Sequence, residues 1–307
     1  MASSAAAYGG QAVIEGVVIR GQRTLALACR RPNGEIYRYR EPLDSPLQRS
    51  RLARLPLVRG VVVLWESLTH GMRMLMRSAD IQMEAEPEAP KPGAGVTAGV
   101  VVTAVAFALL IFVGIPYAAT QLLHAAVGST LLLNLIEGLI RVALLLGYVG
   151  AISLMPDIRR VFAYHGAEHM TIHAFEHGEP LDPPHIEPYP TAHPRCGTAF
   201  LLLVVLVAIL VFAFMPRANL LVDLVARILL VVPVAALAYE LLKLGAAHER
   251  NPLVRLLVAP GLLLQGITTR RPDAGMIEVA VASLQEAIAG DRATAEPEAA
   301  RSEGPAA

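Results

Sequence analysis

The sequence predicts a mainly α-helical, polytopic membrane protein with about four transmembrane helices and a small N-terminal β unit. Of its 307 residues 54% are hydrophobic and only 17% are charged, against roughly 25% charged residues in a soluble domain. No Asp, Glu, Lys or Arg occurs between Pro92 and Glu137, and such a stretch is not typical of a soluble surface. A lipid bilayer is therefore the expected partner, and a net charge of zero gives no argument for binding nucleic acid.

Residues 1–83 are expected to form a cytoplasmic β unit followed by an amphipathic helix. Residues 12–19 are rich in Val and Ile and predict one strand, with further strands over 24–29 and 35–39. Over 55–78, apolar residues recur at three- and four-residue steps. This pattern predicts a helix that either lies on a membrane surface or packs on neighbouring elements.

Four apolar segments follow an acidic, proline-rich linker at 84–95. A helix rises about 1.5 Å per residue, so some 20 residues cross the hydrocarbon core. The predicted spans form two pairs on either side of a histidine-rich loop. The spans cover 96–118, 131–155, 197–215 and 220–244, the pairs cover 96–155 and 197–244, and the loop covers 156–196.

Two of the predicted spans contain charges. Glu137 and Arg141 lie in the second span, and Asp223 and Arg227 lie in the fourth. A charge at mid-bilayer costs on the order of 3 kcal/mol on insertion scales. Because each pair is four residues apart, both are predicted to meet on one helix face, which favours structural pairing over a transport role.

The distribution of basic residues predicts the orientation. The loop at 119–130 has no Lys or Arg, and the turn between the last two spans has only Arg217, whereas thirteen of the 26 basic residues precede residue 92. The positive-inside rule then places both termini and the loop at 156–196 in the cytoplasm of a multi-pass cell-membrane protein. Residues 245–290 are predicted to be cytoplasmic or interfacial, with a disordered tail at 291–307.

The chemistry is concentrated in the histidine-rich loop, where five of nine histidines lie between positions 165 and 185. His165, Glu168 and His169 form an H-x-x-E-H pattern, the inverse of the H-E-x-x-H zinc motif. Histidines four apart on a helix share a face and can bind one metal ion. Glu168 then stands where it can activate a metal-bound water. The spacing predicts a divalent metal site, with zinc as the expected ion and Glu168 as the catalytic residue.

A catalytic zinc site needs three protein ligands and one open position, so the two loop histidines require a partner. His193 and Cys196 are the best candidates, because both are good ligands and lie three apart where the chain re-enters the membrane. Glu240 is the next choice. His173 and Glu15 remain possible.

A non-catalytic interpretation of the same residues is weighed beside this one. Histidines at helical spacing could form a hydrogen-bonded polar face, and Glu168 could pair with Arg159 or Arg160. Glu240 could pair with Lys243. Two histidines and a glutamate in this register, with two further ligand types nearby, favour metal binding.

Long motifs carry a resemblance that covers about residues 8–290. The chain resembles the YqhQ-like bacterial membrane proteins, a family of unknown function described as candidate metal-dependent enzymes. The resemblance implies a metal site at His165, Glu168 and His169 and supplies no substrate. Met170 departs from the family, since a lysine is expected there. The motifs are GGQAVIEGVVIRG (9–21), LPLVRGVVVLWESL (55–68), DIRRVFAYHGAEHMTIHAFE (157–176), HPRCGTAF (193–200), YELLKL (239–244) and TTRRPDAGMIEVA (268–280).

Two functions of different classes follow. The first is a membrane-embedded zinc hydrolase, a protease among the options, with its site at the cytoplasmic face. The alternative is a non-catalytic metal-binding membrane protein that assists membrane-protein assembly or transport. The number of protein ligands distinguishes them, because three ligands and a water indicate an enzyme and four tight ligands indicate a structural ion.

Overall fold

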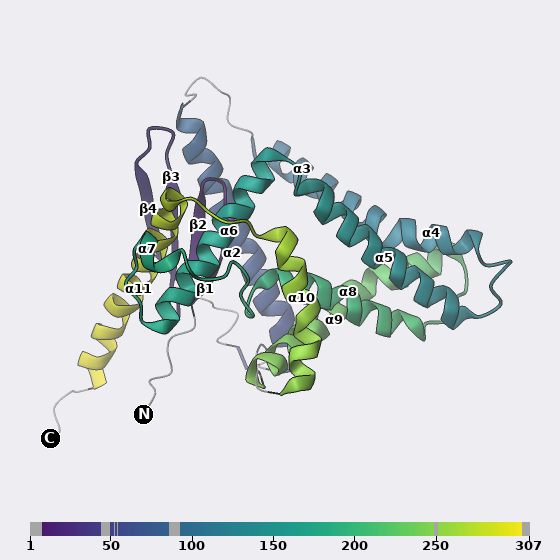
Figure 1. Cartoon of the computed structure of the whole chain (residues 1–307). Helices are drawn as coiled ribbons and strands as arrows, with labels where there is room; N and C mark the ends of the chain where they lie inside the picture. The colour runs from purple at the N-terminus through teal and green to yellow at the C-terminus, as the bar shows by residue number, and fades with distance from the viewer. Residues whose placement is uncertain are drawn as a thin grey trace.

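The protein is described by a computed structural model that covers residues 8–43, 50–51, 53, 55–85, 93–248 and 251–302. Figure 1 shows two parts: a small sheet covered by helices, and a group of long helices that extends away from it. The predicted mainly α-helical fold with an N-terminal β unit is confirmed.

The N-terminal part is an antiparallel sheet of four strands in the order β1-β2-β3-β4. One face packs on α6 (Pro156–His177) and α11 (Ala274–Ser302), through a core that includes Val17, Ala28 and Ile277. The other face packs on α2 (Val58–Gln82). The strands are β1 (Gly9–Val13), β2 (Gly16–Arg20), β3 (Thr24–Arg30) and β4 (Ile36–Pro42).

The single strand predicted over 12–19 is wrong, because the chain reverses at Ile14-Glu15 and forms a hairpin. Glu15 adopts a positive φ of 51° at this turn. Gly16 follows and approaches β3 so closely that a Cβ atom would lie 2.4 Å from the carbonyl oxygen of Ala28. The sequence offered no usual turn dipeptide here, so the Val/Ile run concealed the reversal.

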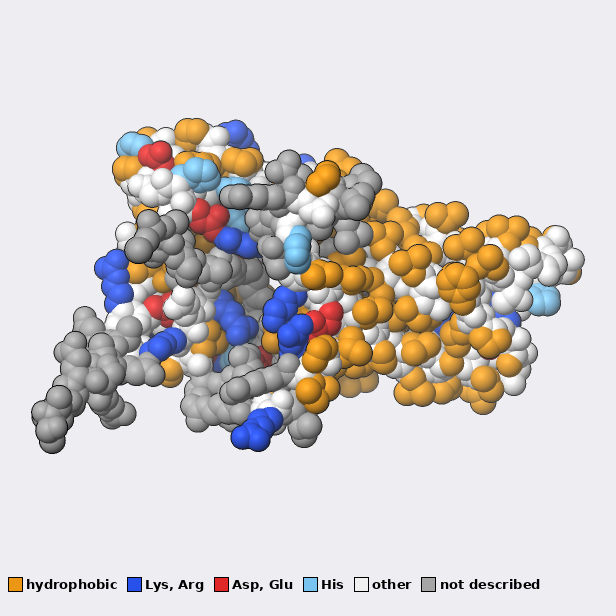
Figure 2. Space-filling view, turned by 90° about the horizontal axis from the view of Figure 1, so that it is seen from below, with side chains coloured by type: hydrophobic (Ala, Val, Ile, Leu, Met, Phe, Trp, Pro, Cys, Tyr) orange, Lys and Arg blue, Asp and Glu red, His pale blue; other side chains and the backbone are white. Residues whose placement is uncertain are grey.

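Three helical segments are long and apolar enough to cross a membrane: Gly95–Leu123, Thr130–Ile152 and Leu220–Gly245. The third predicted span, 197–215, corresponds to the shorter apolar helix Gly197–Ala213. Figure 2 shows hydrophobic side chains covering this part of the molecule, with most Lys and Arg on the other part. The helices are α3 (Ala94–Leu109), the π-helix η3 (Leu110–Gly114), α4 (Ile115–Leu122), α5 (Thr130–Ile152), α8 (Gly197–Ala213), α9 (Leu220–Ala247) and α10 (Pro252–Thr268).

The charges within these helices converge on Glu137. Its buried carboxylate forms ion pairs with Arg141, as predicted, and also with Arg217 and Arg227. The predicted pairing of Asp223 with Arg227 is wrong. Asp223 instead accepts hydrogen bonds from the Tyr117 hydroxyl and the Ala218 amide, because helix packing brings Arg227 to the second span.

Helix α2 buries a different face from the predicted apolar stripe. Gly60, Met74 and Ile81 are buried against α9 and the sheet, while Trp65 and Leu68 stay more than half exposed. Of the two predicted roles for this helix, packing on neighbouring elements is confirmed, and much of the predicted apolar stripe stays exposed.

The C-terminal helix α11 runs to Ser302. It includes part of the segment 291–307 that the sequence predicts to be disordered, and 303–307 lie outside the described residues. Asp291 joins the helix to the turn between β2 and β3, because its carboxylate accepts hydrogen bonds from the backbone amides of Gln22 and Arg23. In the predicted linker at 84–95, residues 86–92 also lie outside the described part, between the short helix η2 (Met83–Ala85) and α3.

Candidate metal centre

The site is built on the buried middle of α6. This helix begins at Pro156 and ends before Gly178, which takes the left-handed conformation common at helix C-termini. Gly166 allows the segment after α10 to approach, since a Cβ atom there would lie 2.0 Å from the carbonyl oxygen of Arg270. Just before this segment, at the end of α10, the carbonyl oxygen of Thr268 lies beside His165.

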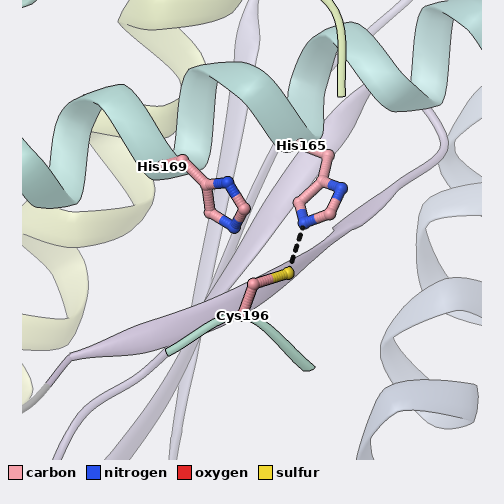
Figure 3. Close-up of side chains that lie close together, drawn as sticks. All are labelled: His165, His169 and Cys196. Atoms are coloured by element: carbon pink, nitrogen blue, oxygen red, sulfur yellow. Dashed lines mark hydrogen bonds between the residues drawn. The ribbon is translucent and has the colours of Figure 1, made fainter. Parts of the chain in front are cut away.

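His165 and His169 point from one face of α6 with defined ring orientations (Figure 3). His165 Nδ1 lies 2.9 Å from the carbonyl oxygen of Thr268, and His169 Nδ1 lies 2.6 Å from that of Thr191. A carbonyl oxygen only accepts, so in each neutral ring Nδ1 carries the proton and Nε2 keeps its lone pair. Metal-binding histidines typically have this arrangement, with the second nitrogen fixed by a carbonyl.

Cys196 supplies the third side chain of the group. It caps α8, and its Sγ lies 3.2 Å from His165 Nε2. One ligand atom each from His165, His169 and Cys196 lie within 4.8 Å of one another, and all three residues are buried. Zinc binds sulfur at about 2.3 Å and nitrogen at about 2.0 Å, so these atoms fit the spread of ligands around one tetrahedral ion.

Glu168 lies beside this triad but is not part of it. Its Oε1 accepts a 2.9 Å hydrogen bond from the amide of Gly10, on the outer edge of β1. Oε2 is buried and has no hydrogen-bond partner among the described residues. Burial raises the pKa of Glu168 to about 7, which suits a group that exchanges protons near neutral pH.

The remaining electrostatics favour neutral side chains. Burial, assisted by His165, lowers the pKa of His169 to about 3, so its ring is uncharged at neutral pH. Burial raises the pKa of the Cys196 thiol. A thiolate there would need a nearby positive charge, which a bound cation would provide.

His193, the other predicted ligand, lies next to the triad but belongs to a neighbouring group. Its ring centroid is 5.6 Å from that of His169 and 4.5 Å from that of His173. Its ligand atom groups with those of His173 and Glu176. Hydrogen bonds to Gln265 hold its backbone in place.

Two acidic residues considered as further ligands lie elsewhere. Glu15 forms an ion pair with Arg160 and accepts a hydrogen bond from Tyr164. Glu240 forms an ion pair with Arg59 of α2, not with Lys243 as the non-catalytic interpretation expected. In this arrangement both serve contacts between elements, and neither groups with the two histidines of α6.

A small cavity of about 30 Å³ opens at the triad, lined by residues that include Gly10, Glu168, His169 and Cys196. A water needs roughly 10–15 Å³ of such space, so about two waters fit. A larger groove of about 570 Å³ adjoins it and shares four lining residues with it. These shared residues are Tyr8, Gly9, Gly10 and Arg195.

Several contributors to the site carried no sequence signal of their own. Thr191 and Thr268 act through backbone carbonyls, which every residue type has. Gln265 acts by holding the loop before Cys196. Only Gly10 could have been suspected, as part of a Gly-Gly pair ahead of a strand-like run.

Comparison with known proteins gives a family and no activity. Residues 55–290 match the family described as "Protein of unknown function (DUF1385)". The uncharacterized protein YqhQ of Bacillus subtilis (strain 168) is 30% identical over 293 residues, which cover 92% of each chain. No solved structure matches. The resemblance predicted from the motifs is thus confirmed at the level of the family.

Proposed function

Because this chain belongs to the DUF1385 family of proteins of unknown function, we propose its activity from the site itself: a zinc-type hydrolase that cleaves a peptide or related acyl bond. His165, His169 and Cys196 would hold the ion, and Glu168 would act as general base and acid. The ligand shell is then three protein side chains with one open position, as catalytic zinc sites have. The proposed shell does not include His193, the other ligand predicted from the sequence, because its ligand atom groups with those of His173 and Glu176.

One observation carries this proposal. Two histidine Nε2 atoms and a cysteine sulfur converge, with both Nδ1 positions fixed by carbonyls, beside a carboxylate whose Oε2 has no partner among the described residues. If these residues formed only a hydrogen-bonded polar face, Oε2 would be expected to have a partner, because a buried polar group without one costs about 1–3 kcal/mol of stability. A site that takes a water and a substrate group gives the oxygen a partner.

The chain's own residues would then act as follows. A bound divalent ion supplies Lewis acidity and lowers the pKa of a water from about 15.7 to about 7. The Gly10 amide holds Glu168 Oε1, which leaves Oε2 available to a water. Glu168 takes a proton from the attacking water and returns it to the leaving group as the acyl bond breaks.

The test separates metal binding from catalysis. We expect Glu168→Gln to retain bound metal and to lose activity at least 100-fold, because it keeps the shape of the side chain but removes the base. His165→Ala should lose the metal as well. The measurements are metal content of the purified protein and complementation of a strain from which the gene is deleted.

The exposed Glu179, just beyond the end of α6, offers a matched control, and Glu179→Gln should behave like the wild type. Full complementation by Glu168→Gln together with failure of His165→Ala would contradict the enzyme and favour the metal-binding assembly protein.

A further inference from the structure

A second group of potential ligands lies on the solvent side of the triad. His173 and Glu176 stand one turn apart on α6 beyond His169, and His193 faces them from the loop before α8. One ligand atom of each lies within 4.8 Å of the others. His173 is half-buried, Glu176 is exposed and His193 is buried.

The hydrogen bonds of this group leave one potential ligand atom available on each residue. His173 Nε2 lies 2.9 Å from the carbonyl oxygen of Ala192, so Nε2 carries the proton and Nδ1 keeps its lone pair. The His173 ring also stacks on Tyr189, with an angle of 7° between their planes. Glu176 forms an ion pair with Arg195 through Oε1, which leaves Oε2 for a second partner.

His193 Nε2 is the atom that lacks a partner. The residue is only 4% exposed, and Nε2 is buried with no hydrogen bond to any described residue. It lies 3.6 Å from Glu176 Oε2, too far for a hydrogen bond. Two ligands at about 2.0–2.2 Å from one tetrahedral zinc ion are themselves separated by roughly 3.4 Å, close to this distance.

We propose that His173 Nδ1, Glu176 Oε2 and His193 Nε2 form a second divalent-cation site, with nitrogen and oxygen ligands only. A cation there gives the orphaned Nε2 a partner. When Nε2 of His193 binds the cation, the proton of the neutral ring must be on Nδ1. Nδ1 then no longer accepts the 3.2 Å hydrogen bond from the Arg195 amide, so this hydrogen bond is lost. This loss, and the guanidinium of Arg195 on the same carboxylate, make the second site weaker than the triad. The proposal extends the metal-dependent function above.

Cobalt(II) distinguishes the two sites, because only the triad contains a thiolate, which gives a sulfur-to-cobalt charge-transfer band. We expect the full-length protein in detergent, stripped by a chelator, to bind two equivalents. The first should produce the charge-transfer band and the second only weaker ligand-field bands. Glu176→Gln, which preserves side-chain volume, and His173→Ala should each weaken the second equivalent at least tenfold and leave the first unchanged.

Cys196→Ala should abolish the charge-transfer band and keep the second site. Cys29 is a buried cysteine on β3, so Cys29→Ala should keep both the band and the second site. His177→Ala provides a further control on the same helix and should bind two equivalents. Binding of a single equivalent by the wild type, or a second equivalent unaffected in both Glu176→Gln and His173→Ala, overturns the second site. Absence of the charge-transfer band with the second site intact would instead count against the proposed hydrolase centre.

Discussion

At the scale of single residues, Glu168 is a buried carboxyl group that lines the small cavity at the triad. Its carboxyl group is buried, has one hydrogen bond from the Gly10 amide and leaves Oε2 without a partner among the described residues. Burial therefore raises its pKa from the ordinary 4.5 to about 7. The folded, metal-free protein favours the protonated acid more strongly than the unfolded chain does.

This shift predicts a pH-dependent stability in the presence of a chelator. The stabilisation that the protonated Glu168 gives the folded protein is fully present below about pH 4.5. It is lost as the pH rises through about 7, where the folded protein must hold a buried carboxylate. A shift of this size corresponds to about 3 kcal/mol. Glu168→Gln mimics the neutral acid, so it should match the wild type at pH 4.5 and unfold at a higher temperature at pH 8.

Thermal unfolding of both proteins in detergent, from pH 4.5 to 8, measures this difference. Glu179→Gln is again the control, because that carboxylate is exposed. A gap between Glu168→Gln and the wild type that does not change with pH would contradict the assigned ionisation.

At the scale of elements, β1 joins the sheet to the metal centre. Its residues pair with β2 from Gly9↔Arg20 to Val13↔Gly16, and the Gly10 amide points outward to Glu168. A Cβ atom on Gly10 would lie 1.9 Å from the carbonyl oxygen of Val18. The close approach of two backbones therefore requires glycine at this position.

The adjacent glycines allow a matched comparison. Gly10→Ala should displace β1, weaken the hydrogen bond to Glu168 and destabilise the protein by about 1–3 kcal/mol, as overpacking does. Gly9→Ala should have little effect, since a Cβ atom there meets nothing within 4 Å. Thermal unfolding and metal content of the two variants report on this difference, and equal behaviour would contradict the role of the β1 edge.

At the scale of the whole molecule, one buried carboxylate links the apolar helices. Glu137 of α5 binds Arg141 on its own helix, Arg227 on α9 and Arg217 in the turn between α8 and α9. The Arg217 guanidinium also reaches Thr120 of α4 and Asn134 of α5. This network ties three helices and the turn between α8 and α9 together, where few other polar contacts are possible.

Removing the negative charge of Glu137 should therefore lower the free energy of unfolding. Glu137→Gln would leave three buried guanidinium groups without their shared counter-charge, and breaking a buried pair typically costs about 3–5 kcal/mol. The partly exposed Arg59–Glu240 pair provides the control, because Glu240→Gln should change stability little. Thermal unfolding in detergent measures both, and a stable Glu137→Gln protein would show that helix packing alone holds this region.

The orientation predicted from the Lys/Arg distribution can be tested directly. Reporters that are active only in the cytoplasm should work when fused at the C-terminus, and reporters active only outside should work at about residue 125. The loop at 156–196, and with it the metal centre, would then face the cytoplasm. Activity of an external reporter within that loop would reverse the model of the orientation.

The sequence by itself determined those features that depend on local periodicity. The apolar runs identified the candidate membrane helices, because hydrophobic length alone decides whether a helix can span. The spacing of His165 and His169 put both rings on one face, because helix geometry repeats every 3.6 residues. The ion pair of Glu137 with Arg141 followed from the same spacing.

Only the tertiary structure decided which distant groups meet. It grouped Cys196 with the two histidines and His193 with His173 and Glu176, although both candidates stand three residues apart in one loop. It directed Glu15 and Glu240 to arginines on other elements. The physical reason is that these contacts depend on how helices and strands pack. They join residues that lie from tens to more than a hundred positions apart in the chain, and local patterns carry no information about a partner at that separation.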